Sequence, residues 1–282
     1  MKKTKIFILI ATITIIICAF YITSKGGERS PEEKIVVAAS IMPQKEFIEA
    51  VGGDKVKVIV MVPPGADPHT YEPQPSQLRE LSKAKIYFQV GSGIEFEKTW
   101  MEKLKELNPK MEIVNCSEGI KLIKEDPHVW TSPQNAIIMV ENIYKTIIKE
   151  DPANRDYYTK NKDQYISRLK ELNRKFNQTL TEKQNKKILV YHPAWTYLFK
   201  DYKIEQITIE QEGKEPSPQK LAKIIQEAKK ANIKIIIISP RSNKQSAKAI
   251  AEEIGAKTVT IDPLAENYIE NMEKMLQILK DI

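Results

Sequence analysis

Short apolar, β-branched runs alternate along the chain with longer stretches of helical periodicity from residue 34 onward. The first set predicts strands at residues 35–40, 56–62, 85–90 and 112–117, with helices at 44–51, 75–84 and 95–108. The second set predicts strands at residues 187–192, 204–210, 233–239 and 257–262, with helices at 195–202, 218–231, 244–254 and 267–281. Strand–helix alternation favours parallel sheets. The pattern therefore predicts an α/β protein with two doubly wound parallel-sheet lobes of about four strands each.

The segment that joins the two sets has a different pattern. Residues 154–184 are polar and charged, contain neither Pro nor Gly, and carry Tyr165, Leu169, Leu172 and Phe176 near helical spacing. This pattern predicts one long α-helix of about 45 Å that bridges the lobes. The predicted organisation is residues 1–30 as a signal or anchor segment, 31–153 as the N-terminal lobe, 154–184 as the linking helix and 185–282 as the C-terminal lobe.

The N-terminus has the pattern of an export segment. Three lysines within the first five residues precede an apolar run over residues 6–22, as in a secretory signal. The run is also long enough to serve as an uncleaved membrane anchor. Cys18 lies inside it and could carry a lipid, although Ile17 departs from the small residue that a lipoprotein signal places there. We expect an exported protein on the outer face of the cytoplasmic membrane, tethered by this segment or by lipid on Cys18.

The net charge of the chain has a different interpretation once residues 1–30 are counted separately. The chain has 282 residues and a formal charge of +7, which raises nucleic acid or a membrane surface as partners. Residues 1–30 hold five basic residues and one acidic residue, so the remainder carries only +3. The sequence contains no P-loop, RNA-binding signature or zinc-finger spacing. We therefore expect no nucleic-acid partner, and Cys116 alone in the remainder rules out an intrachain disulfide there.

All three histidines of the sequence stand beside a proline: His69, His128 and His192. Proline stiffens the backbone around each imidazole. His192 ends a predicted strand, and Asp262, followed by a proline, ends another. Open parallel sheets bind ligands outside the carboxyl ends of their strands, so two residues from each lobe would face each other across a cleft.

Three imidazoles and one carboxylate make a ligand set of the kind that holds zinc. Each ring would also need an acceptor for its second nitrogen, and the nearby candidates are Asp67, Asp126 and Glu215. A histidine taken alone is more often structural or exposed, and Asp262 alone would be a turn residue. The repeated Asp-Pro-His, with partners in the other lobe, favours a metal site in the cleft.

Four sequence segments resemble the ligand loops of the cluster A-I zinc/manganese solute-binding proteins of ABC importers. They are PGADPHTYEP at residues 64–73, DPHVWTSP at 126–133, YHPAW at 191–195 and DPL at 262–264. The segment GKEPSP at 213–218 is also similar to a loop of that family. The resemblance covers nearly all of the chain after residue 34.

The resemblance implies two α/β lobes, one bridging helix and no catalysis. Such a protein captures a divalent metal outside the cell and passes it to a membrane permease. Carried over residue by residue, the ligands would be His69, His128, His192 and Asp262. Manganese members usually have a carboxylate at the third position, where this chain has His192, and nitrogen ligands suit zinc. We therefore expect Zn²⁺, with Mn²⁺ as the alternative, and a monomeric protein.

Two other functional classes compete with this interpretation. A catalytic zinc keeps an open position for water, whereas three histidines and an aspartate leave no vacancy, and the sequence has no His-Glu-x-x-His helix. A zinc-dependent hydrolase is thus the less favoured alternative. An adhesion or interaction role has no sequence feature of its own.

Overall fold

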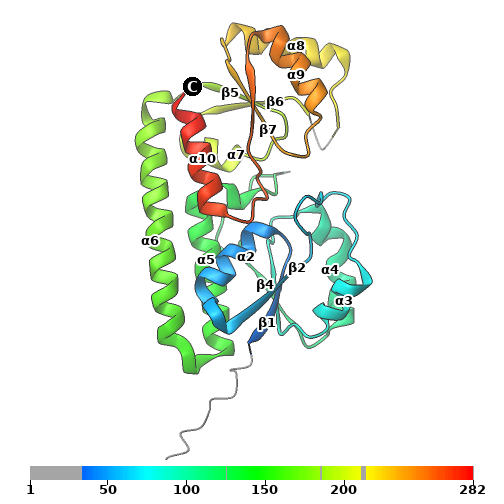
Figure 1. Cartoon of the computed structure of the whole chain (residues 1–282), viewed down its shortest axis with the longest axis vertical. Coiled ribbons are helices and arrows are strands. Elements are labelled where there is room, and N and C mark those ends of the chain that lie inside the picture. Colours follow the sequence, from blue (N-terminus) through cyan, green and yellow to red (C-terminus); the bar gives the residue numbers. More distant parts are fainter. Residues whose placement is uncertain (1–33, 125, 185, 211–213, 282) are drawn as a thin grey trace, which may run out of the picture. The chain divides into compact units, whose positions relative to one another are not determined.

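The computed structural model describes residues 34–124, 126–184, 186–210 and 214–281. Residues 35–282 form one compact unit that contains both sheets (Figure 1). The predicted export segment at residues 1–30 lies outside the described residues. None of the helices formed by the described residues has the length and apolar character needed to span a bilayer.

The N-terminal lobe is built on a four-stranded sheet with the order β2-β1-β3-β4. Its strands are β1 (Ile35–Ala39), β2 (Val56–Val60), β3 (Ile86–Gln89) and β4 (Glu112–Asn115). Its helices include α2 (Met42–Gly52), α3 (Pro75–Leu81) and α4 (Glu95–Leu107). All strand pairs are parallel, so the carboxyl ends of the strands meet at one edge.

The C-terminal lobe repeats this arrangement with the order β6-β5-β7-β8, again all parallel. Its strands are β5 (Lys187–Val190), β6 (Glu205–Thr208), β7 (Ile235–Ile238) and β8 (Lys257–Thr260). Its helices are α7 (Thr196–Asp201), α8 (Pro218–Lys230), α9 (Lys244–Ile254) and α10 (Tyr268–Lys280). Ser217 caps α8 by accepting the Lys220 N–H, and Pro218 occupies the first helical position.

The bridging helix is α6 (Arg155–Leu180), which lies within the predicted range of 154–184. Its 26 residues span roughly 39 Å at 1.5 Å per residue. One stripe of α6 is buried, at Tyr158, Tyr165, Ile166, Leu169, Leu172, Phe176 and Leu180. In Figure 1 it runs beside α5 (Pro133–Glu150) and α10, against which it packs.

Helix α5 is absent from the sequence prediction, although its signals are present. Ser132 accepts the Asn135 N–H as an N-cap, and Pro133 follows at the first position. Residues 133–150 lie between the two strand–helix sets and belong to neither, so the alternation of strands and helices did not predict this helix. The predicted fold class is confirmed: two parallel α/β lobes are bridged by one long helix.

The described residues form two hydrophobic cores, which differ in extent. The larger one runs from the N-terminal sheet through α6 and α10 and reaches Ile188 of β5 and Ile237 of β7. The smaller one lies within the C-terminal lobe and takes Leu189 and Ile236 from the same two strands. Successive side chains of a strand point to opposite faces. The second sheet therefore contributes one face to each core.

Candidate metal centre

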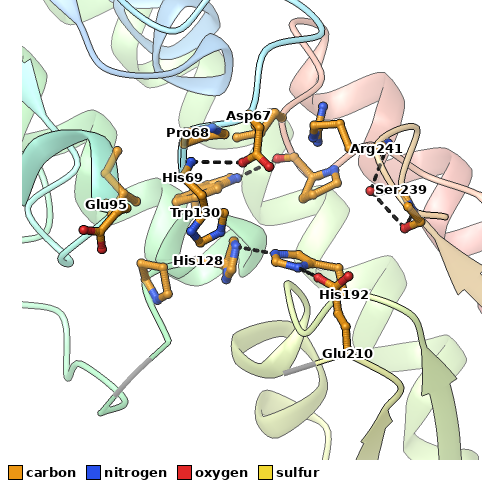
Figure 2. A pocket seen from close by; sticks show the side chains of 15 residues that line it. Asp67, Pro68, His69, Glu95, His128, Trp130, His192, Glu210, Ser239 and Arg241 are labelled. Carbon is orange, nitrogen blue, oxygen red and sulfur yellow. Dashed lines mark hydrogen bonds and ion pairs between the residues drawn. The ribbon is translucent and has the colours of Figure 1, made fainter. Parts of the chain in front are cut away.

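A small cavity lies where loops from both lobes meet, and all three histidines line it (Figure 2). Its volume is about 140 Å³, below the roughly 300–1,000 Å³ of sites for organic ligands. His69 and His128 come from loops that follow β2 and β4, while His192 stands two residues after the end of β5. The cavity thus has the size for an ion and is lined by imidazoles from both lobes.

His128 is the most enclosed of the three imidazoles, with 8% of the residue exposed. Asp126 holds it twice: its Oδ1 accepts the backbone N–H at 2.9 Å and lies 2.8 Å from the ring Nδ1. Burial is the main cause that lowers the pKa of His128; the bond to Asp126 opposes it, and His192 and His69 lower the pKa further. The ring is therefore held neutral.

Asp126 is correspondingly held as a carboxylate. Burial alone would raise the pKa of its carboxyl, but hydrogen bonds from His128 and other neighbours outweigh burial and lower it. A carboxylate can only accept hydrogen bonds, so the proton of the neutral imidazole sits on Nδ1. The Nε2 lone pair of His128 then points away from Asp126.

His192 has a similar partner in Glu210, whose Oε1 is hydrogen-bonded to the ring Nδ1. Pairing of β5 with β6 continues past both strands: Ile209 N–H donates to the Val190 carbonyl, and Glu210 N–H to that of Tyr191. This extended pairing carries the Glu210 side chain beside the ring. Nothing in the local sequence around His192 marks Glu210, which is 18 residues away, and sequence analysis missed it.

The two Nε2 atoms of His128 and His192 lie 3.1 Å apart. Each Nδ1 is directed at a carboxylate, so the two Nε2 atoms face each other across the cavity. An ion between them can be bound by both nitrogens. Two nitrogens bound to a tetrahedral zinc at 2.0–2.1 Å lie about 3.3 Å apart. The pair thus has nearly the separation that a shared metal ion requires.

His69 and Asp262 stand further from this pair. The His69 ring centroid is 6.0 Å from that of His192, and the residue is exposed. Asp262 is absent from the residues that line the cavity; its carboxylate is paired with Arg241, which does line it. Across the described residues, no three His, Cys, Asp or Glu side chains form a ready-made ligand group. The structure brings three predicted ligands to one cavity and leaves the fourth paired with Arg241.

The other predicted acceptors have different partners. Asp67 accepts the backbone N–H of His69 at 3.0 Å, which forms the same turn that Asp126 forms with His128. Glu215 accepts a hydrogen bond from the Tyr191 hydroxyl. Asp126 is therefore the one candidate of the three that the structure places against an imidazole.

Contacts between the lobes frame the cavity. The indole of Trp130 donates to the Pro263 carbonyl at 2.7 Å, next to the His128 ring (Figure 2). Tyr197 of α7 bonds through its hydroxyl to the Ile123 N–H at 2.7 Å in the loop before His128. These bonds fix the N-terminal loop against the C-terminal lobe, so the two histidines are held in register.

Two α/β lobes with donor side chains between them define a protein that captures a small solute. The family of zinc-uptake complex component A, periplasmic, matches this sequence over residues 37–282. The chain belongs to this family, whose members are extracytoplasmic solute-binding proteins rather than enzymes.

Individual relatives agree with this assignment. The high-affinity zinc uptake system protein ZnuA of Bacillus subtilis (strain 168) is 29% identical, over 99% of this chain and 97% of its own. A crystal structure of ZnuA is 38% identical and superposes with a TM-score of 0.84, over 88% of this chain and 99% of that one. A ZnuA deletion mutant with zinc bound is 39% identical, with a TM-score of 0.82, over 88% and 97% of the two chains.

Proposed function

We propose that this protein is the extracytoplasmic component of an ABC importer that captures Zn²⁺ and delivers it to a membrane permease. The observation that carries the proposal is the facing pair of imidazole nitrogens of His128 and His192, 3.1 Å apart. Each ring is backed by a carboxylate that directs its free nitrogen into the cavity. Family membership and the zinc-bound relative support the same conclusion.

The proposed ligands are His69, His128, His192 and Asp262. His128 and His192 would bind first, because their nitrogens already face each other. His69 stands on an exposed loop and would turn toward the ion, as the 6.0 Å between its ring centroid and that of His192 implies. Asp262 would complete a tetrahedral set of three nitrogens and one oxygen, which suits zinc better than manganese.

The principal test is metal analysis of protein purified without added metal, followed by competition between zinc and manganese. We expect about one zinc per chain and a higher melting temperature on zinc addition, because the ion binds only the folded state. A manganese-loaded protein that zinc fails to displace would contradict the choice of metal.

His192→Ala removes one of the two facing nitrogens. We expect zinc affinity to fall by more than about 100-fold, beyond the 10- to 100-fold typical of losing an outer-shell partner. Gln226→Ala, on the exposed face of α8 in the same lobe, is the control and should bind zinc like the parent. Unchanged binding by His192→Ala would refute the site assignment.

We further propose that residues 1–30 export the protein and tether it, as a monomer, to the outer face of the cytoplasmic membrane. The support is the lysine-rich start followed by the apolar run at residues 6–22. Intact mass and fractionation of the expressed protein test this. A retained run or a lipid on Cys18 would support the tether, whereas a cleaved, freely soluble chain would contradict it.

A further inference from the structure

Arg241 introduces a positive charge into a cavity otherwise suited to a cation. It belongs to the loop after β7, while Asp262 follows β8, and these neighbouring parallel strands pair Ile238 with Thr260. The register brings the two loops side by side at the carboxyl ends of the strands. Figure 2 shows Arg241 beside Ser239 at the wall of the cavity.

Both oxygens of the Asp262 carboxylate are engaged by this arginine. Arg241 Nη2 lies 2.5 Å from Oδ1, and Nη1 lies 3.4 Å from Oδ2. Oδ1 also accepts the Leu264 N–H at 2.9 Å, so the carboxylate has a fixed direction. The arginine and aspartate side chains are 18% and 27% exposed. A partly buried, two-point guanidinium–carboxylate pair is stronger than an exposed ion pair.

A metal ion that used Asp262 would meet a carboxylate whose charge and oxygens already serve Arg241. We propose that Arg241 is an affinity-determining residue, which competes with the captured metal for the Asp262 carboxylate. The inference rests on the proposed metal site and deepens it. The guanidinium and the metal ion are alternative partners of Asp262, and metal capture transfers the carboxylate from the guanidinium to the ion. Affinity is thereby kept below what the four ligands alone would provide, which favours release to a permease.

Arg241→Met tests the competition, because it removes the charge and keeps much of the packing. The metal-free variant is titrated with Zn²⁺ against a chromogenic chelator, beside the parent. We expect a Kd at least about tenfold lower than that of the parent. Lys248→Met removes one charge from an exposed position on α9 in the same lobe and should leave the Kd unchanged. An unchanged Kd in Arg241→Met would overturn the proposal.

A double-substitution cycle separates competition from simple repulsion between Arg241 and the ion. In an Asp262→Asn background, Arg241→Met should no longer tighten zinc binding, because no carboxylate remains to be released. Equal tightening in both backgrounds would refute competition. Arg241→Lys keeps the charge but loses the two-point contact, so it should give a smaller decrease in Kd than Arg241→Met. It also tests the proposal if Arg241→Met does not fold. Failure of the metal site itself is distinguishable, because the parent would then not bind zinc.

Discussion

The two lobes share one strand order but prepare their sides of the cavity in different ways. In the N-terminal lobe, Asp126 holds His128 within one turn, through both its backbone and its ring. In the C-terminal lobe, His192 depends on Glu210 from a neighbouring strand, and Asp262 is engaged by Arg241. One side is organised by local sequence and the other by tertiary contacts. On the proposed ligand set, each lobe presents one prepared imidazole, His128 or His192. His69 in one lobe and Asp262 in the other must move to reach the ion.

Among the tests of this contrast between the lobes, the largest effect is expected at the two carboxylates that hold the imidazoles. Asp126→Ala and Glu210→Ala should each weaken zinc binding by about 10- to 100-fold, because each leaves an imidazole without its orienting carboxylate. Asp126→Ala should also lower the melting temperature of the metal-free protein, because it removes the turn at His128; Glu210→Ala should lower it less. Zinc titration and thermal unfolding measure the two effects.

Glu215→Ala is the matched control for this pair. Glu215 bonds to the Tyr191 hydroxyl and not to an imidazole, so its zinc affinity should equal that of the parent. If all three variants bound zinc equally, the orienting role of the carboxylates would be wrong. If Glu210→Ala destabilised the metal-free protein as much as Asp126→Ala, the contrast between the lobes would not hold.

A smaller effect is expected at the contact that joins the lobes beside the cavity. Trp130→Phe removes the indole N–H and leaves the buried Pro263 carbonyl without that donor, at a cost of about 1–3 kcal/mol in the free energy of unfolding. Urea unfolding of the metal-free protein checks this value. Trp100→Phe, on a half-buried position of α4, should cost less. Equal losses of unfolding free energy in the two variants would show that the Trp130–Pro263 hydrogen bond does not stabilise the protein.

The smallest effect concerns pH. Burial holds the pKa of His128 below its ordinary value near 6.5 in the folded protein. The unfolded chain then binds more protons, so this contribution to stability is complete above about pH 6.5 and declines as pH falls toward the folded pKa. The slope for one proton cannot exceed about 1.4 kcal/mol per pH unit. Metal-free His128→Gln should lose less stability than the parent between pH 7.5 and 5.5 in thermal unfolding; an identical loss would contradict this assignment.

The sequence could reveal most of the fold because strand and helix periodicities are local. All eight strands in the described part of the chain were predictable within about two residues of their ends. The bridging helix followed from an unbroken polar segment with Tyr165 and Phe176 near helical spacing. Helix α5 was not predicted, because it interrupts the strand–helix alternation. Its N-cap and its apolar spacing are both clear in the sequence.

The candidate site divides in the same way. His69 and His128 stand in a visible Asp-Pro-His repeat, and Asp126 could be proposed from its position two residues before its ring. Glu210 and Arg241 could not, because their partners are 18 and 21 residues away and meet them only through strand pairing. The assignment of Asp262 as a ligand stays a prediction. Its ion pair with Arg241 could not be predicted from the sequence.

The larger hydrophobic core has a consequence for how the protein unfolds. Helix α10 returns from the second sheet and packs Tyr268 against Phe47 of α2. The larger core therefore contains side chains of both lobes. Global unfolding should then be a single cooperative event in which both sheets and α6 are lost together. The smaller core, confined to one face of the second sheet and helices α8 and α9, can open by itself. Amide hydrogens of that outer layer should exchange with solvent before those of the bridging helix.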